Sequence, residues 1–129
     1  LINEQKPLMT ISIHQNSYTS PEIKGAQVFY YTTSSESQKL AEILQKTLIE
    51  QVDTENHREA KANDSYYLLK RTDSVIVIVE CGFLSNPQEA EKLSDEDYQQ
   101  KMVNAICTGI NRYLGRDETQ QETVKNSEE

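Results

Sequence analysis

The sequence has few of the side chains that bind metals through nitrogen or sulphur: two histidines and two cysteines among 129 residues. Cys81 and Cys107 do not have the spacing of a zinc-binding pair, and whether they form a disulfide stays open. Cys107 lies in a helical pattern and is expected to be a small core residue. His57 lies in a polar stretch, where we expect it to be solvated. Because a catalytic zinc needs three protein ligands, His14 alone does not make one.

Long apolar runs and an excess of positive charge are also missing. The longest apolar run covers residues 75–79, too short for a signal peptide or a transmembrane helix. The net charge of −8 comes without a basic stripe, which argues against binding to nucleic acid. Residues 116–129 carry much of the negative excess and one apolar residue, so we expect this acidic tail to be disordered.

Hydrophobic patterning predicts strands over residues 9–14, 26–31 and 75–79. Leucines recur every fourth residue from Leu40, with Gln45 among the polar residues on the other side, which predicts an amphipathic helix capped near Ser34. Further helices are expected over 88–93 and from Asp95 or Asp97 to about 114. Residues 53–64 form a long polar loop, and 65–69 a short helical or extended piece.

These alternating strands and helices predict an α/β layered domain. The five β-branched residues at 75–79 are expected to be buried on both sides, which is typical of parallel sheets covered by helices. We therefore expect an open, mostly parallel, twisted sheet with helices on both faces.

Two polar residues come at the ends of predicted strands. Glu80 follows the run at 75–79, beside Gly82, which is expected to let the chain turn sharply. His14 ends the first predicted strand. Ligands of open α/β sheets bind at this edge, and a carboxylate is costly to bury there unless it is paired or bound to metal. Alone, Glu80 is as readily a turn residue or helix cap, and His14 a structural histidine; together they predict a site.

Five motifs in one collinear order resemble the zinc-dependent N-acetylmuramoyl-L-alanine amidases of the amidase 3 family, in particular its sporulation-specific, CwlD-type enzymes. The motifs are Ser-Ile-His-Gln-Asn-Ser at 12–17, Gly-Ala-Gln-Val-Phe-Tyr-Tyr at 25–31, Ser37 with Leu40 and Ala41, Tyr-Tyr-Leu-Leu-Lys at 66–70, and Val-Glu-Cys-Gly-Phe-Leu-Ser-Asn-Pro at 79–87. The last predicted helix fits the same family. The similarity covers residues 9–114.

The resemblance implies an activity, a cofactor and site residues. The activity is hydrolysis of the amide between N-acetylmuramic acid and L-alanine in peptidoglycan, with Zn²⁺ as cofactor. His14 corresponds to the family's last zinc ligand, and Glu80 to the glutamate that activates the attacking water. Asn16 and Arg58 are weaker candidates for holding the glycopeptide, and a solvated polar role is at least as plausible for both.

The sequence also departs from the family. The segment of Pro-Gly-His-Gly-Gly type that carries the first histidine ligand, the later glutamate ligand and the first sheet strand have no counterpart in it. We therefore interpret residues 1–115 as the C-terminal portion of an amidase 3 catalytic domain, followed by the tail at 116–129. Ser74 stands where the family usually has proline, which changes the entry to the strand and nothing catalytic.

Other interpretations remain. One is a remnant without catalytic activity that only binds peptidoglycan, and another is an ordinary α/β domain whose His14 and Glu80 are unrelated. As an amidase, the protein is expected outside the cytoplasm, in the cell envelope or spore cortex region, where it would act in muramic δ-lactam formation. Its partners would be the peptidoglycan glycan strand and stem peptide, with accessory wall proteins unknown.

Overall fold

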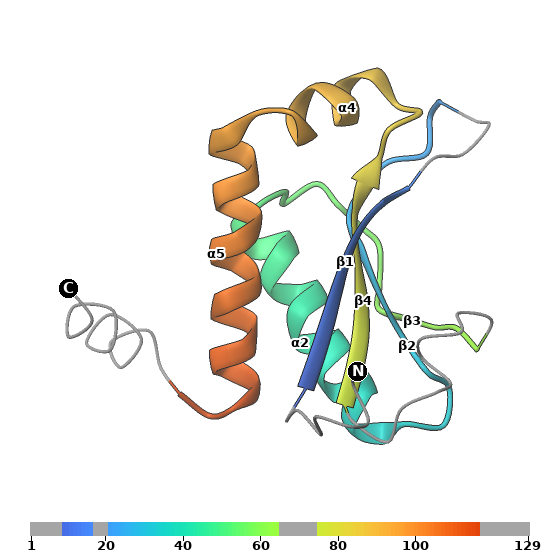
Figure 1. The fold of residues 1–129 in the computed structure, drawn as a ribbon, viewed down its shortest axis with the longest axis vertical. Coiled ribbons are helices and arrows are strands. Elements are labelled where there is room, and N and C mark those ends of the chain that lie inside the picture. The colour runs from blue at the N-terminus through green and yellow to red at the C-terminus, as the bar shows by residue number, and fades with distance from the viewer. Residues whose placement is uncertain (1–8, 17–20, 65–74, 117–129) are drawn as a thin grey trace.

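The computed structural model describes residues 9–16, 21–64 and 75–116 (Figure 1). Its elements confirm the α/β class. They are, in chain order, β1 (Met9–Asn16), β2 (Gln27–Tyr30), α2 (Ser35–Gln51), β3 (Lys61–Ala62), β4 (Val75–Phe83), α4 (Pro87–Leu93) and α5 (Glu96–Tyr113). The piece predicted at 65–69 and the tail from residue 117 onward lie outside the described residues, and the absence of the family's first strand from this chain stays a prediction.

The four strands form one sheet in the order β1-β4-β2-β3 (Figure 1). β1 is parallel to β4, and β2 to β3, whereas β4 and β2 are antiparallel. The sheet is therefore mixed, with two of its three pairings parallel. β4 has a neighbouring strand on each side and apolar packing on both faces, so residues 76–79 are each at most 2% exposed, while Val75 at its start is partly buried. This confirms the prediction that the run is buried on both sides.

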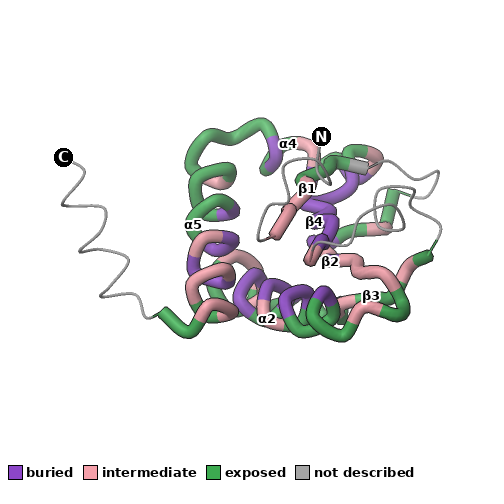
Figure 2. The backbone as a smooth tube through the Cα atoms, turned by 60° about the horizontal axis from the view of Figure 1, so that its bottom comes forward, coloured by how far each residue is buried: buried purple, intermediate pink, exposed green. Residues whose placement is uncertain are grey.

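The main hydrophobic core lies between one face of the sheet and the helices. Val77 and Val79 of β4 pack there with three leucines of α2 and with the apolar side of α5. Figure 2 shows the buried residues of α2 and α5 on the sides of these helices that face β4. On the opposite face, Ile76 and Ile78 pack with Phe29 and Tyr31. Among the described residues the helices cover only the first face, so helices on the second face stay a prediction.

The helix starts follow the predicted capping residues. The Ser34 side chain accepts a hydrogen bond from the Ser37 amide at 3.2 Å, and Asp95 accepts one from the Asp97 amide at 2.9 Å. Within α2, one expectation is wrong. Gln45 is only 3% exposed, because its side chain bonds the Val28 N–H and the Ala26 carbonyl at the start of β2. A hydrophobic pattern cannot distinguish a buried side-chain amide that hydrogen-bonds two backbone groups from a polar residue on the surface.

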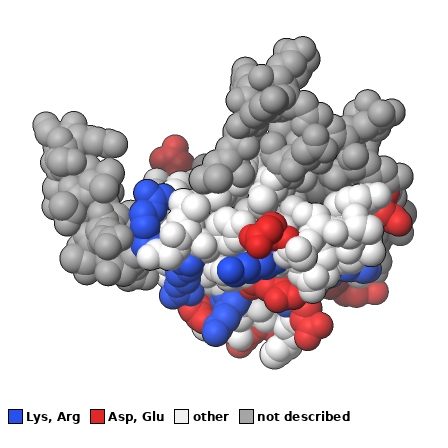
Figure 3. All heavy atoms as spheres, turned by 90° about the horizontal axis from the view of Figure 1, so that it is seen from below, with Lys and Arg blue, Asp and Glu red and all other residues white. Residues whose placement is uncertain are grey.

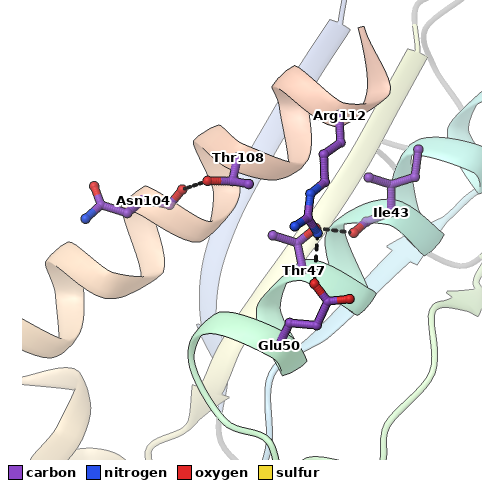
Figure 4. A network of polar contacts seen from close by, with 6 residues as sticks. All are labelled: Ile43, Thr47, Glu50, Asn104, Thr108 and Arg112. Atoms are coloured by element: carbon purple, nitrogen blue, oxygen red, sulfur yellow. Dashed lines mark hydrogen bonds and ion pairs between the residues drawn. The ribbon is translucent and has the colours of Figure 1, made fainter. Parts of the chain in front are cut away.

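A polar network joins α2 to α5, from the buried Thr47 to the half-exposed Glu50 (Figure 4). Arg112 Nη1 donates to Thr47 Oγ1 and to Glu50 Oε2, both at 3.0 Å. Arg112 and Glu50 are each about two-fifths exposed, so this ion pair contributes roughly 0.2–1 kcal/mol. Figure 3 views the molecule from the end opposite α4 and shows acidic and basic side chains interspersed there. The Arg112–Glu50 ion pair thus adds little, and apolar packing holds α2 and α5 together.

That packing predicts a large effect of a small substitution, Gly109→Ala. A Cβ at this position in α5 would lie 2.5 Å from Leu44 Cδ2, and Leu44 is completely buried. We expect a loss of about 1–3 kcal/mol in the free energy of unfolding, the usual cost of overpacking a core. Urea unfolding followed by circular dichroism measures it. Val103→Ala, an exposed site on the same helix, is the control and should change stability by less than about 0.5 kcal/mol. An unchanged unfolding midpoint for Gly109→Ala would contradict this packing.

Several predicted boundaries differ from the structure. The stretch at 53–64, expected to be all loop, contains β3, whose two residues pair with Phe29 and Tyr30 of β2. A strand this short leaves no hydrophobic period to detect. β1 and β4 also extend beyond the predicted ends at His14 and Glu80, to Asn16 and Phe83. Both candidate site residues therefore lie inside strands.

Candidate active site

His14 and Glu80 are directly opposite each other in the parallel pair β1 and β4. Val77 and Val79 face the helices, and side chains alternate along a strand, so Glu80 lies on the second face of the sheet with Ile76 and Ile78. His14 Nδ1 is 3.8 Å from Glu80 Oε1. The sheet therefore brings together the two residues that the sequence predicted as a site.

Glu80 has the environment of a reactive carboxylate. Its side chain is 2% exposed, and within the described part of the chain its Oε2 atom is buried with no hydrogen-bond partner. Burial raises the pKa of the Glu80 carboxyl above its ordinary value, and the nearby His14 partly opposes the rise. A buried oxygen without a partner is costly, which indicates that this atom is used by something that binds at the site. A raised pKa also makes Glu80 a stronger base when it is ionised.

His14 is accessible and is oriented by its own strand. Its side chain is 43% exposed, and Nε2 lies 3.0 Å from the hydroxyl of Ser12, on the same face two residues earlier. The other ring nitrogen is turned towards Glu80. A hydrogen bond to the ring nitrogen that does not face the metal commonly fixes the ring of a metal-binding histidine. The arrangement suits His14 as a ligand whose open side is shared with Glu80.

The strand β4 is irregular immediately after Glu80. Between the pair His14–Glu80 and the pair Asn16–Phe83, β1 advances two residues while β4 advances three. The extra residue is a β-bulge, and it turns both Cys81 and Gly82 towards the helices. The expected sharp turn at Gly82 is wrong, because the strand continues to Phe83 and only Gly25 and Gly115 among the described glycines have positive φ.

Arg58 reaches the same region from the loop before β3. Gln27 is the antiparallel partner of Glu80, so its side chain is on Glu80's face of the sheet. Arg58 donates from Nη1 to Gln27 Oε1 at 3.0 Å and from Nε to the Lys24 carbonyl at 2.7 Å, and its guanidinium carbon is 5.0 Å from the centre of the Phe83 ring. Sequence reasoning missed Gln27, although it lies in the motif at 25–31.

The remaining candidates take simpler positions. Asn16 lies in β1 opposite Phe83, one step beyond the bulge. His57 is exposed, as predicted. Both cysteines are free, which answers the question of a disulfide. Burial first, and then the Glu80 carboxylate, raise the pKa of the Cys81 thiol to about 11, so it is protonated and unreactive at neutral pH.

A separate cavity of about 450 Å³ lies between the loop at 53–58, Lys24 and the start of α4. Neither His14 nor Glu80 lines it. Two of its buried polar side chains, Asn56 and Asn86, already bond the carbonyls of Ala26 and Pro21. Across residues 9–16, 21–64 and 75–116, no group of three or more histidine, cysteine or acidic residues is placed to hold a metal ion. The His14–Glu80 pair therefore remains the candidate active site.

Residues 1–112 match the family described as N-acetylmuramoyl-L-alanine amidase. The chain belongs to this amidase family. It is 38% identical over 114 residues to the germination-specific N-acetylmuramoyl-L-alanine amidase of Bacillus subtilis, an alignment that covers 88% of this chain and 48% of that protein. The chain thus spans about half the length of this curated amidase.

Solved amidase structures share the fold. The CwlD amidase of Clostridioides difficile, solved in complex with the GerS lipoprotein, is 41% identical with a TM-score of 0.86, over 88% of this chain and 58% of that one. A second N-acetylmuramoyl-L-alanine amidase from Clostridium difficile 630 is 27% identical with a TM-score of 0.82, over 88% and 61% of the two chains. The sheet and helices described above are therefore the fold of this part of the amidase domain.

Proposed function

We propose that this chain is the C-terminal part of a zinc-dependent N-acetylmuramoyl-L-alanine amidase, which hydrolyses the amide between N-acetylmuramic acid and L-alanine in peptidoglycan. The observation that carries the proposal is the buried Glu80 oxygen without a partner, beside an accessible histidine on the next strand. The term full-length domain is used for this chain together with the upstream half that its relatives possess. His14 would be one zinc ligand in it, and the upstream half would supply the others.

The residues present fit a zinc ion. His14 offers an imidazole nitrogen on the side of Glu80, and its other ring nitrogen lies 3.0 Å from the Ser12 hydroxyl. A zinc ion held here polarises a carbonyl and lowers the pKa of water towards neutrality. Glu80 accepts the proton of the attacking water and returns it to the leaving nitrogen of L-alanine. Its burial excludes solvent, which keeps that proton at the site.

Substrate contacts are proposed for the residues around this pair. Arg58 is held on Glu80's side of the sheet by Gln27 and Phe83, where its fixed positive charge suits the carboxylates of a stem peptide. Asn16 continues β1 two residues beyond His14 and would contact the glycan or the lactyl group. Both roles are proposed from position alone, Asn16 in β1 and Arg58 in the loop before β3.

The likeness to a germination-specific amidase and to CwlD supports a role in the spore cortex, including muramic δ-lactam formation. The protein would act outside the cytoplasm, in the envelope. Within the described residues, no helix has the length and apolar character needed to cross a membrane. The CwlD structure contains a lipoprotein partner, and we propose that this chain's full-length domain also binds an envelope protein.

An assay on isolated peptidoglycan tests the proposed activity. The full-length domain should release new amino-terminal L-alanine without producing new reducing sugar ends, because the glycan bonds stay intact. A domain that sediments with peptidoglycan but exposes no L-alanine would instead favour the remnant that only binds the wall. That alternative is supported by one observation, the lack of a complete metal-binding group among the described residues.

The 129-residue chain purified alone is expected to hold no stoichiometric zinc and to leave peptidoglycan uncleaved. The physical reason is that one histidine and one buried glutamate do not make a three-ligand zinc site. Elemental analysis after dialysis against micromolar zinc measures this. One zinc per chain would show that the ligand set is complete without the upstream half.

A further inference from the structure

We propose that Glu89 is a positioning residue for Glu80. Its carboxylate holds the bulged end of β4 in the shape that keeps Glu80 beside His14. This inference rests on the proposed function, because it concerns the efficiency of the base at the same site. Glu89 lies in α4 and is 6% exposed, yet it belongs to neither the His14–Glu80 pair nor the hydrophobic core.

The bulge creates the need for this carboxylate. Where three residues of β4 run against two of β1, a backbone group of β4 loses its partner in the ladder. The Phe83 N–H, at the end of the bulge, donates to Glu89 Oε1 at 3.3 Å. A buried N–H requires an acceptor, and α4 supplies it.

The same oxygen also binds the strand on the other side of β4. The Gly25 N–H donates to Glu89 Oε1 at 2.8 Å. Gly25 has φ of +96° and lies two residues before Gln27, the antiparallel partner of Glu80. One carboxylate oxygen therefore ties the chain entering β2 to the chain leaving the bulge, and both attachments lie two to three residues beyond Glu80 along β4.

Glu89 is itself firmly held. The side-chain oxygen of Asn86 caps α4 by accepting hydrogen bonds from the backbone N–H groups of Gln88 and Glu89. The Asn86 Nδ2 donates to the Pro21 carbonyl at 2.8 Å. Gly82 leaves the space that the carboxylate occupies, because a Cβ there would lie 3.0 Å from Glu89 Oε1. The glycine in the bulge is thus explained by the carboxylate beside it rather than by a turn.

Variants of the full-length domain loaded with zinc test this inference. Glu89→Ala removes the shared acceptor, whereas Glu89→Gln keeps an oxygen that accepts both N–H groups. Glu91→Ala, an exposed carboxylate on the same helix, is the matched control. We expect Glu89→Ala to lower kcat by about 10–100-fold, since misplacing a reacting group by about 1 Å has effects of that order. KM and zinc content should stay unchanged in Glu89→Ala. The kcat of Glu89→Gln and of Glu91→Ala should stay within about threefold of the original.

Hydrogen exchange gives a readout that does not depend on activity. The amides of Gly25 and Phe83 should exchange faster in Glu89→Ala and at the original rate in Glu89→Gln. Gly82→Ala presses on the carboxylate from the other side, and it should lower kcat in the same way if Glu89→Ala does not fold. Faster exchange of both amides with an unchanged kcat would overturn the positioning role. An equal loss of kcat in Glu89→Gln and Glu89→Ala would also overturn it. If the original domain releases no L-alanine, the proposed function fails, while the exchange rates still decide whether the carboxylate holds the bulge.

Discussion

Replacing Glu80 by glutamine in the full-length domain is expected to abolish most turnover while zinc stays bound. Glutamine has the same shape but no basic oxygen, so the attacking water loses its proton acceptor. General bases contribute about 10²–10⁴-fold, and we expect kcat to fall by that factor. Release of L-alanine from peptidoglycan, together with zinc content, measures the two effects separately.

The fold should tolerate Glu80→Gln well. Burial raises the pKa of the Glu80 carboxyl, which means that the ionised form is costly to keep in this place. An uncharged amide of equal size removes that cost, so the free energy of unfolding should not decrease. Glu91→Gln on the exposed side of α4 is the control for loss of a negative charge. Near-normal turnover by Glu80→Gln would remove Glu80 from the mechanism.

Replacing His14 by alanine is expected to remove zinc and activity together. Loss of an outer-shell partner alone weakens metal binding by about 10–100-fold, and loss of a ligand should exceed that. The affinity for zinc should therefore fall by more than about 100-fold, with turnover absent at submicromolar free zinc. Competition with a chromophoric chelator measures the affinity.

His57 offers a matched control for this experiment. It is exposed in the loop before β3, and its replacement by alanine should leave zinc affinity and turnover unchanged. Excess zinc should restore part of the turnover of His14→Ala if the upstream ligands stay in place. If His14→Ala kept the original affinity, the metal would be held elsewhere and the assignment of His14 would be wrong.

Much of this arrangement was predictable because strong local signals coincide with it. The five β-branched residues before Glu80 make a strand that water cannot reach, and β4 is indeed enclosed between two strands. Parallel neighbours align their equivalent ends, which is why His14 and Glu80 are opposite each other although 66 positions apart in the sequence. Their meeting also depends on β1 being the direct neighbour of β4, which the sequence did not predict.

The details around the pair could not be read from periodicity. The Glu89 carboxylate beside the bulge also bonds the chain before β2, so Gly82 looked like a turn when it makes room for Glu89. Arg58 comes from a loop without hydrophobic period, and its bond to Gln27 depends on how that loop folds onto β2. Long-range contacts between polar groups have no signature in a local pattern.

We propose that His14 and Glu80 are this chain's share of a zinc-dependent amidase site. The most direct measurement is an anomalous difference map of crystals of the full-length domain, recorded at the zinc absorption edge. We predict one zinc peak bonded to a ring nitrogen of His14, on the sheet face that carries Glu80. A zinc peak with no bond to His14 would contradict the account.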